Sequence, residues 1–269
     1  MSKKIGVLGC GWLGLPLARQ LVGNSHQVYG TTTSSDKLIV LEKEGIAPYL
    51  ISLSSTEIHG DIEGFLSHVD ILIINVPPRL RGNNAESFYK KMELLLDEVK
   101  KSPVTKILFI SSTSVYGDIE GEVTEETLPK PTTESGKQLL DSEELFKNVD
   151  SLQTTVIRFG GLIGPERHPV TMLSGRENLS NGDDPVNLIH QDDCIRMIVN
   201  VMDEQLWGRT FNGVYPLHPT KRDYYSSEAK KRGIPPPTYK VETPIKRGKT
   251  VTSMHFHQCH PIFKTSIGS

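Results

Sequence analysis

This sequence has few cysteines and few long hydrophobic runs, and its charges of the two signs nearly balance. The chain of 269 residues holds three cysteines, 30 basic residues and 32 acidic residues, and its formal net charge is −2. This balance argues against nucleic acid and anionic membranes as partners, because both attract basic patches. So few cysteines in a chain of this length indicate a reducing compartment.

The start of the chain, MSKKIGVLGCGWLG, is apolar only over a short stretch. The stretch is too short and too interrupted by glycine to be a signal peptide or a membrane span. We therefore expect a cytoplasmic protein without a membrane partner.

Short β-rich runs alternate with helical patterns up to about residue 160. Continuous apolar runs such as ILIIN and KILFI are typical of a parallel sheet that is covered on both faces. The alternation predicts an α/β fold with a doubly wound parallel sheet, the Rossmann fold. The predicted strands are Ile5–Leu8, Gln27–Thr31, Tyr49–Leu53, Asp70–Val76, Ile107–Ser111 and Thr155–Phe159.

The alternation of strands and helices ends after residue 160. Glycine and proline become frequent there, and only 192–202 has a clear helical pattern. We expect residues 1–160 to form a nucleotide-binding core. Residues 161–269 are then a smaller, irregular substrate-side part that packs on the core and does not fold by itself.

A glycine-rich turn joins the first predicted strand to the first predicted helix. Its G-x-G-x-x-G pattern, in this strand–turn–helix setting, is typical of dinucleotide binding. Gly9 allows the tight turn, Gly11 lets the backbone approach a pyrophosphate, and Gly14 lets helix and strand pack closely. The helix N-terminus adds amide groups that favour phosphate. We predict that the cofactor is contacted by Gly9, Cys10, Gly11, Trp12, Leu13 and Gly14.

The end of the second predicted strand lacks the acid that would bind the ribose 2′-hydroxyl of NAD. Thr32 stands there instead, followed by Thr33 and Ser34, with Lys37 nearby. These side chains suit a 2′-phosphate, which favours NADP over NAD. The alternative is that the hydroxyls of residues 33–35 cap the next helix. The other predicted cofactor contacts are Asn75, Val76, Pro77 and Ser111.

The stretch KILFISSTSVYGD, residues 106–118, ends a buried strand in four hydroxyl residues, although unpartnered hydroxyls in a core cost free energy. With the glycine motif and the later stretches VIRFGGLIGPE, PVNLIHQDDCIRMIV and GRTFNGVYP, it resembles the extended short-chain dehydrogenase/reductase family. That family contains NAD(P)-dependent nucleotide-sugar epimerases and dehydratases. The resemblance implies that Ser112 lies beside the nicotinamide and hydrogen-bonds the substrate oxygen.

The acid/base pair of that family, Tyr-x-x-x-Lys at the start of the next helix, is absent here. Ser135 stands at the tyrosine position and Leu139 at the lysine position, and a shift to use Lys137 puts Thr133 in place of tyrosine. A serine hydroxyl needs an activating base to act as a phenol does. Ser135 and Gln138 also fit a helix capping box. The resemblance is therefore to an atypical branch of the family, and Tyr116 and Glu134 are candidates for the acid by proximity alone.

Other polar stretches have ordinary structural explanations. Asp192 and Asp193 are expected to cap the helix that follows, and His190 to make local contacts. Arg247 and Lys249 stand where the family places basic residues near a substrate diphosphate, but the favoured interpretation is that they belong to a solvated loop. No metal site is predicted, although a histidine-rich stretch near the end contains His255, His257, Cys259 and His260.

Two functions follow from these patterns. One is an NADP- or NAD-dependent reductase or epimerase that acts on a small molecule of the nucleotide-sugar kind. The other is a dinucleotide sensor or regulator that kept the fold without the chemistry. The resemblance is also compatible with a homodimer.

Overall fold

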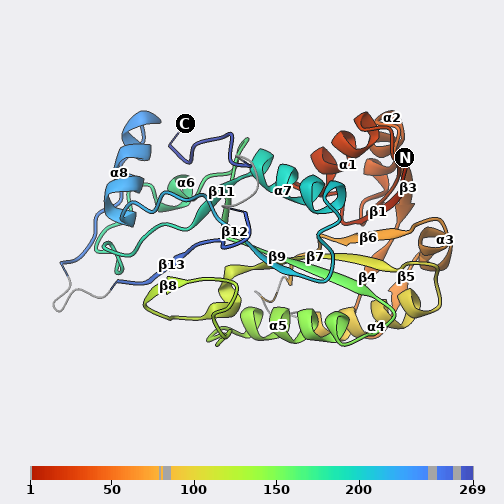
Figure 1. Ribbon diagram of the computed structural model, residues 1–269. Helices are drawn as coiled ribbons and strands as arrows, with labels where there is room; N and C mark the ends of the chain where they lie inside the picture. Colours follow the sequence, from red (N-terminus) through yellow and green to blue (C-terminus); the bar gives the residue numbers. More distant parts are fainter. Residues whose placement is uncertain (1, 79, 81–85, 242–246, 257–261, 269) are drawn as a thin grey trace. The chain divides into compact units, whose positions relative to one another are not determined.

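A seven-stranded sheet with the strand order β12-β9-β7-β6-β1-β2-β3 forms the centre of the computed structural model (Figure 1). The structure describes residues 2–78, 80, 86–241, 247–256 and 262–268. The order runs outward from β1 to β3 and then returns through β6, so the predicted doubly wound sheet is confirmed. The strands are β1 (Lys4–Leu8), β2 (Gln27–Thr32), β3 (Ala47–Leu50), β6 (Ile71–Ile74), β7 (Lys106–Ser112), β9 (Gln153–Phe159) and β12 (Thr210–Gly213).

Helices cover both faces of this sheet. Helices α4 (Phe88–Lys100) and α5 (Glu134–Lys147) pack against each other on one face, and α1 (Gly14–Gly23) lies on the other (Figure 1). The continuous apolar run of β6 is buried along its whole length, as a strand covered on both faces should be. In α4, the residues that point to the sheet recur at helical spacing: Phe88, Met92, Leu95, Leu96 and Val99.

The chain forms two compact units. The first comprises Met1–Ser112, Thr133–Ile157 and Ile198–Thr210, and the second Thr113–Thr132, Arg158–Met197 and Phe211–Ser269. The first unit also holds α2 (Leu38–Lys43), α3 (Ile62–Ser67) and the antiparallel pair of β4 (Ser52–Leu53) and β5 (Ile58–His59). The predicted division at residue 160 into a core and a dependent part stays a prediction.

The second unit has its own short strand pairs and a separate hydrophobic cluster. β8 (Gly121–Val123) pairs in parallel with β13 (Lys249–Val251), and β10 (Gly161–Ile163) with β11 (Leu188–His190). Helices α6 (Pro169–Leu173) and α8 (Lys221–Lys231) belong to this unit. Its buried cluster contains Ile163, Val170, Val186, Leu188, Tyr224, Tyr225, Ala229 and Ile267.

Helix α8 was not predicted. Its sequence, KRDYYSSEAKK, is charged at both ends, and its buried apolar residues are only Tyr224, Tyr225 and Ala229. The predicted strand Tyr49–Leu53 was wrong as a single element, because the structure divides it between β3 and β4. Helix α7 (Gln191–Asp203), which straddles the two units, agrees closely with its predicted range.

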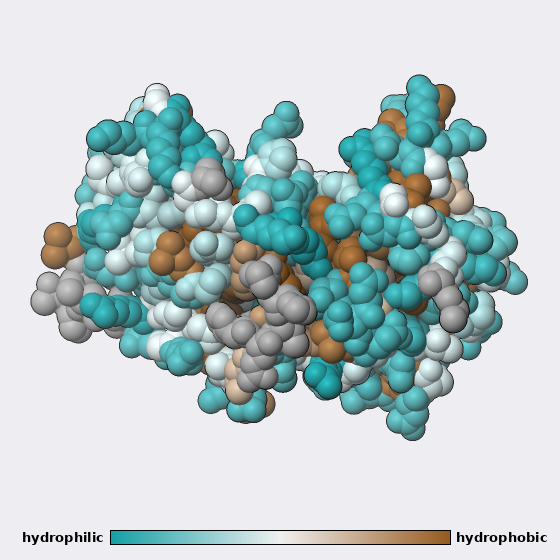
Figure 2. Space-filling view, turned by 45° about the horizontal axis from the view of Figure 1, so that its top comes forward, coloured by the Kyte–Doolittle hydropathy of each residue, from teal (hydrophilic) through white to brown (hydrophobic). Residues whose placement is uncertain are grey.

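The surface is largely hydrophilic on the face shown in Figure 2. No helix among the described residues has the length and apolar character that crossing a membrane requires. The large hydrophobic side chains that are exposed include Ile39, Val40, Leu50, Leu128, Met172, Leu217, Val241 and Met254.

Candidate functional site

The glycine-rich loop lies between β1 and α1, at the point where the strand order of the sheet reverses. Both neighbouring strands hold it in place. The Gly9 N–H donates to Thr31 Oγ1 at 2.9 Å, and the Cys10 N–H donates to the Thr31 carbonyl at 2.9 Å. From the other side, Asn75 Nδ2 donates to the Gly9 carbonyl at 3.0 Å. The loop is therefore shaped by the fold before any ligand arrives.

The three motif glycines differ in what a side chain would meet. Gly9 has a φ of +103°, and a Cβ there would lie 2.6 Å from the Asn75 carbonyl oxygen. A Cβ at Gly14 would lie 2.1 Å from the Gly9 carbonyl oxygen. A Cβ at Gly11, in contrast, would have no heavy atom within 4 Å. Gly9 and Gly14 are thus required by packing, whereas Gly11 keeps an open space.

Cys10 and Leu13 shape this loop from the inside. The Cys10 side chain is buried and its Sγ lies 3.8 Å from the Val7 carbonyl oxygen, while burial raises the pKa of the thiol to about 12. The Cys10 N–H donates to the Thr31 carbonyl, so neither the N–H nor the thiol of this residue is directed at a ligand. Leu13 is also buried, whereas Trp12 is half-buried. No side chain caps the start of α1 and its first turn holds no acid.

The hydroxyls after β2 do not cap the next helix. Thr32 Oγ1 accepts from the Ser34 N–H at 3.2 Å, and the 3-10 turn that follows (Ser35–Lys37) receives no side-chain cap. Helix α2 receives none either. The capping alternative is therefore wrong. Thr33 and Lys37 are exposed beside this turn, and Ser34 is half-buried.

The ends of β6 and β7 lie on the same side of the reversal point, because parallel strands bring their carboxyl ends to one edge. Asn75 binds the glycine loop, Val76 is half-buried and Pro77 is exposed. Ser112, the last residue of β7, is half-buried. Ser111 is buried, and its hydroxyl donates to Glu143 Oε1 at 2.5 Å. The Ser111 side chain therefore faces α5, which corrects the expectation that its hydroxyl lines the site.

The start of α5 is capped differently from the prediction. Thr133 Oγ1 accepts from the Gly136 N–H at 3.1 Å, so Thr133 is the N-cap and the Ser135–Gln138 capping box is wrong. Gln138 Oε1 instead accepts from the first amide of α4, that of Phe88, at 2.6 Å. Leu139 is 4% exposed and belongs to the core. A lysine at that position would bury its charge, so the family's lysine has no counterpart here.

The two candidates for the missing acid lie in different surroundings. Tyr116 is fully buried, its hydroxyl donates to Asn212 Oδ1 at 2.8 Å, and Arg158 Nη1 donates to it at 3.1 Å. Burial raises the pKa of the phenol, although Arg158 and Asn212 oppose that shift. Glu134 is exposed and accepts from Gln138 Nε2 at 2.6 Å. Tyr116 is thus a structural residue that links strands β9 and β12 to the segment after β7.

We predict that Tyr116→Phe destabilises the protein by about 1–3 kcal/mol, because it removes the buried hydroxyl that donates to Asn212 Oδ1 and accepts from Arg158 Nη1. Dinucleotide affinity is expected to stay within about twofold of the wild type. Chemical denaturation and calorimetric titration measure the two effects. A variant of unchanged stability would show that the buried hydroxyl network does not hold this segment.

The acids at the start of α7 are not helix caps, because they lie inside its first turn. Asp193 is fully buried and accepts from the Lys264 N–H at 2.9 Å and from the Thr265 hydroxyl. It therefore fastens the C-terminal segment of the second unit. The expected local contact of His190 is confirmed, since its Nδ1 accepts from the Asp192 N–H at 3.2 Å.

The basic residues near the predicted diphosphate site and the histidine-rich stretch near the end of the chain lie in different surroundings. Lys249 Nζ donates to the Gly117 carbonyl, and burial lowers the pKa of this amine. Arg247 is exposed. His257, Cys259 and His260 lie outside the described residues, and His255 contacts the Phe211 ring. Within the part of the chain that the structure describes, no group of three or more metal-ligating side chains is found.

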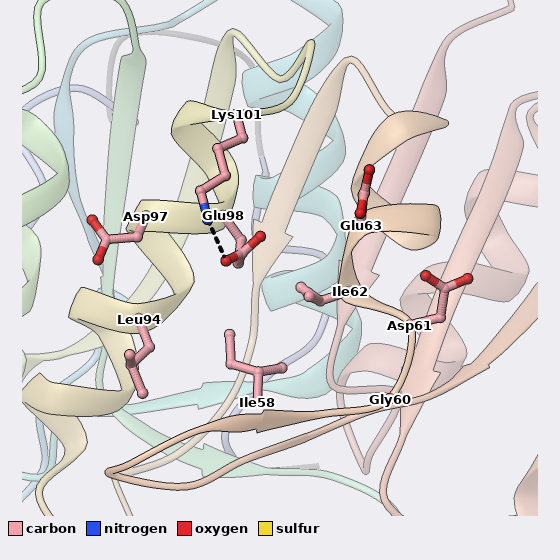
Figure 3. Close-up of a pocket in the computed structure, with 9 residues that line it drawn as sticks. All are labelled: Ile58, Gly60, Asp61, Ile62, Glu63, Leu94, Asp97, Glu98 and Lys101. Atoms are coloured by element: carbon pink, nitrogen blue, oxygen red, sulfur yellow. Dashed lines mark hydrogen bonds and ion pairs between the residues drawn. The ribbon is translucent and has the colours of Figure 1, made fainter.

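A surface hollow of about 420 Å³, drawn in Figure 3, is lined by none of the predicted site residues. Its wall contains the carboxylates of Asp61, Glu63, Asp97 and Glu98. The single lysine in it, Lys101, is paired with Glu98 at 2.8 Å. Carboxylates repel phosphate, so this hollow does not suit a dinucleotide.

Three residues of this region escaped the sequence analysis. Thr31 holds the glycine loop, Glu143 binds Ser111, and Gly30 leaves room for the Cys10 thiol, since a Cβ there would lie 2.7 Å from Sγ. A glycine inside a predicted strand is a signal for such a close approach. Thr31 and Glu143 carry no comparable signal.

Comparison with known proteins agrees with the geometry of the loop. The family model for the NAD binding domain of 6-phosphogluconate dehydrogenase matches residues 4–127, which include the glycine loop and the ends of β2, β6 and β7. Solved structures share the fold. MoeE5 in complex with UDP-glucose and NAD has a TM-score of 0.79 at 18% identity, covering 98% of this chain and 95% of that chain.

A second solved structure, UDP-glucuronic acid 4-epimerase from Bacillus cereus in complex with NAD, has a TM-score of 0.73 at 21% identity, covering 93% of this chain and 86% of that one. Among curated proteins, the uncharacterized UDP-glucose epimerase YtcB of Bacillus subtilis is 23% identical over 174 residues, which is 56% of this chain and 55% of that protein. Protein YeeZ of Escherichia coli K12 is 32% identical over 250 residues, which is 93% of this chain and 91% of the relative. The chain therefore belongs to the same family as Escherichia coli YeeZ.

Proposed function

We propose that this protein binds NADP at the glycine loop and acts as a reductase or epimerase on a small molecule of the nucleotide-sugar kind. The observation that carries the proposal is the preformed loop, with its open position at Gly11, at the reversal point of the sheet. Open α/β sheets bind ligands at that point. The match of the NAD-binding family model to residues 4–127 supports the same assignment.

In this proposal each part of the dinucleotide lies near the end of a particular strand. The pyrophosphate would lie against Gly11 and the uncapped start of α1, where the helix dipole favours negative charge. The adenosine ribose would lie near Thr32 at the end of β2, and the nicotinamide near Ser112 at the end of β7. NADP is favoured over NAD because Thr32 carries no charge and exposed Lys37 can attract a 2′-phosphate, although Asp36 beside it opposes this.

The substrate class comes from the relatives. MoeE5 and the Bacillus cereus epimerase are named with UDP-sugars, and YtcB is named a UDP-glucose epimerase. A bound nicotinamide would supply hydride transfer. In this chain Ser112 would hydrogen-bond the reacting oxygen of the substrate, as the resemblance to the epimerases implies. A homodimer in the cytoplasm is part of the same proposal.

A non-catalytic dinucleotide sensor is the second candidate, and a specific observation favours it. The position of the family's lysine is core residue Leu139, and the Tyr116 hydroxyl is occupied by Asn212 and Arg158. An acid/base group of the usual kind is thus missing from α5 and from the segment after β7.

We predict little or no turnover of UDP-glucose or other common UDP- and TDP-hexoses, because Ser135 and Leu139 stand where the family has its acid/base tyrosine and its lysine. The assay incubates the protein with the sugar and NADP or NAD, and follows sugar conversion by NMR and cofactor reduction by absorbance. Weak turnover that Ser112→Ala abolishes would support an enzyme, and binding without turnover would support a sensor. Robust turnover that Ser112→Ala leaves unchanged would show that the active site lies elsewhere.

A further inference from the structure

Helix α5 carries one ionisable side chain on its buried face. The buried residues of this helix are Gly136, Leu139, Ser142, Glu143 and Phe146, and Glu143 is fully buried. It lies two helical turns after Ser135, on the face that packs against β7. Its Oε1 accepts from the Ser111 hydroxyl at 2.5 Å.

A carboxylate that is removed from water needs hydrogen-bond donors. Hydrogen bonds to a charged acceptor are strong, so the donor residue is held firmly in place. One donor is Ser111, the residue directly before Ser112 at the carboxyl end of β7. The pair joins α5 to the last two residues of that strand. Side chains that orient a functional residue in this way are often as important as the residue itself.

We propose that Glu143 is a positioning residue of the nucleotide site, which fixes the end of β7 through Ser111 and so sets the position of Ser112 on the nicotinamide side. This inference rests on the proposed function. Glu143 should therefore affect only the nicotinamide end of the cofactor. The glycine loop and the end of β2 are held by Thr31 and Asn75, which do not depend on α5.

Two probes separate the two ends of the cofactor. NADPH contains the nicotinamide, whose fluorescence responds to its surroundings, whereas adenosine 2′,5′-bisphosphate contains only the adenosine end. We expect Ser111→Ala to weaken NADPH binding about tenfold and to reduce the change of nicotinamide fluorescence on binding. The affinity for adenosine 2′,5′-bisphosphate should stay within about twofold.

Ser142→Ala is the matched control. Ser142 is also fully buried, and its hydroxyl donates to the Gln138 carbonyl within α5 at 2.6 Å, so the variant deletes a buried hydroxyl without touching β7. It should bind both probes as the wild type does. Glu143→Gln keeps an acceptor oxygen for Ser111, and we expect it to bind NADPH within about threefold of the wild type. If Ser111→Ala does not fold, Glu143→Ala, which removes the acceptor, replaces it and should weaken NADPH binding about tenfold without changing the affinity for adenosine 2′,5′-bisphosphate.

The inference is overturned if Ser111→Ala and Ser142→Ala bind NADPH equally well, with the same fluorescence change. It is also overturned if Glu143→Gln weakens both probes equally, because the effect would then not be confined to the nicotinamide end. In these cases wild-type binding stays intact and only the role of Glu143 fails. If the wild type binds neither probe, the proposed function fails and this inference fails with it.

Discussion

Gly11→Val is expected to weaken dinucleotide binding about a hundredfold or more while the free energy of unfolding changes by less than about 1 kcal/mol. A Cβ at Gly11 would meet no heavy atom of the protein within 4 Å, so the fold has room for the new side chain. The same space is where a pyrophosphate must approach the backbone. Affinity is measured by calorimetric titration with NADP and NAD, and stability by chemical denaturation.

Two other glycines supply the controls for this result. Gly23, at the far end of α1, also has no heavy atom within 4 Å of its Cβ position, so Gly23→Val should bind the cofactor normally. Gly14→Ala should instead destabilise the protein by several kcal/mol, about the cost of a severe packing clash, because its Cβ would meet the Gly9 carbonyl oxygen. Unchanged affinity in Gly11→Val would show that the loop does not hold the pyrophosphate.

Thr32→Asp is expected to reverse the cofactor preference. The wild type should bind NADP more tightly than NAD, and the aspartate should weaken NADP binding about tenfold or more, because a carboxylate repels a nearby 2′-phosphate. It should strengthen NAD binding, since an acid at this place accepts from the ribose hydroxyl. Competition titrations with both cofactors give the ratio of the two affinities.

Thr32→Asn is the control that separates the effect of the negative charge of aspartate from the effect of its size and shape. The Thr32 hydroxyl accepts from the Ser34 N–H, and both aspartate and asparagine can make the same turn. The asparagine variant should therefore keep its preference for NADP. A wild type that binds NAD clearly more tightly than NADP would contradict the assignment of this position.

Much of the first unit could be predicted from the sequence. The apolar runs of β6 and β7 indicated buried parallel strands, which the structure contains. The glycine motif predicted a tight turn before α1, which the positive φ of Gly9 confirms. These features depend on neighbouring residues and on the chain geometry, so a local pattern is enough to find them.

The contacts that depend on distant residues could not be predicted. Ser111 was taken for a side chain of the site because nothing nearby in the sequence shows that its hydroxyl donates to Glu143, 32 residues later in the chain. Ser135 and Gln138 fitted a capping box, but the tertiary contact of Gln138 with the start of α4 and the cap at Thr133 prevail. Helix α8 was missed because its charged ends hide a narrow apolar face.

Calorimetric titration of the unaltered protein with NADP and with NAD shows whether the glycine loop holds a dinucleotide. We expect one dinucleotide to bind per chain, NADP to bind more tightly than NAD, and adenosine 2′,5′-bisphosphate to compete for the same site. No heat of binding from either dinucleotide at concentrations up to about 1 mM would contradict it, because even a weak specific site is detectable there.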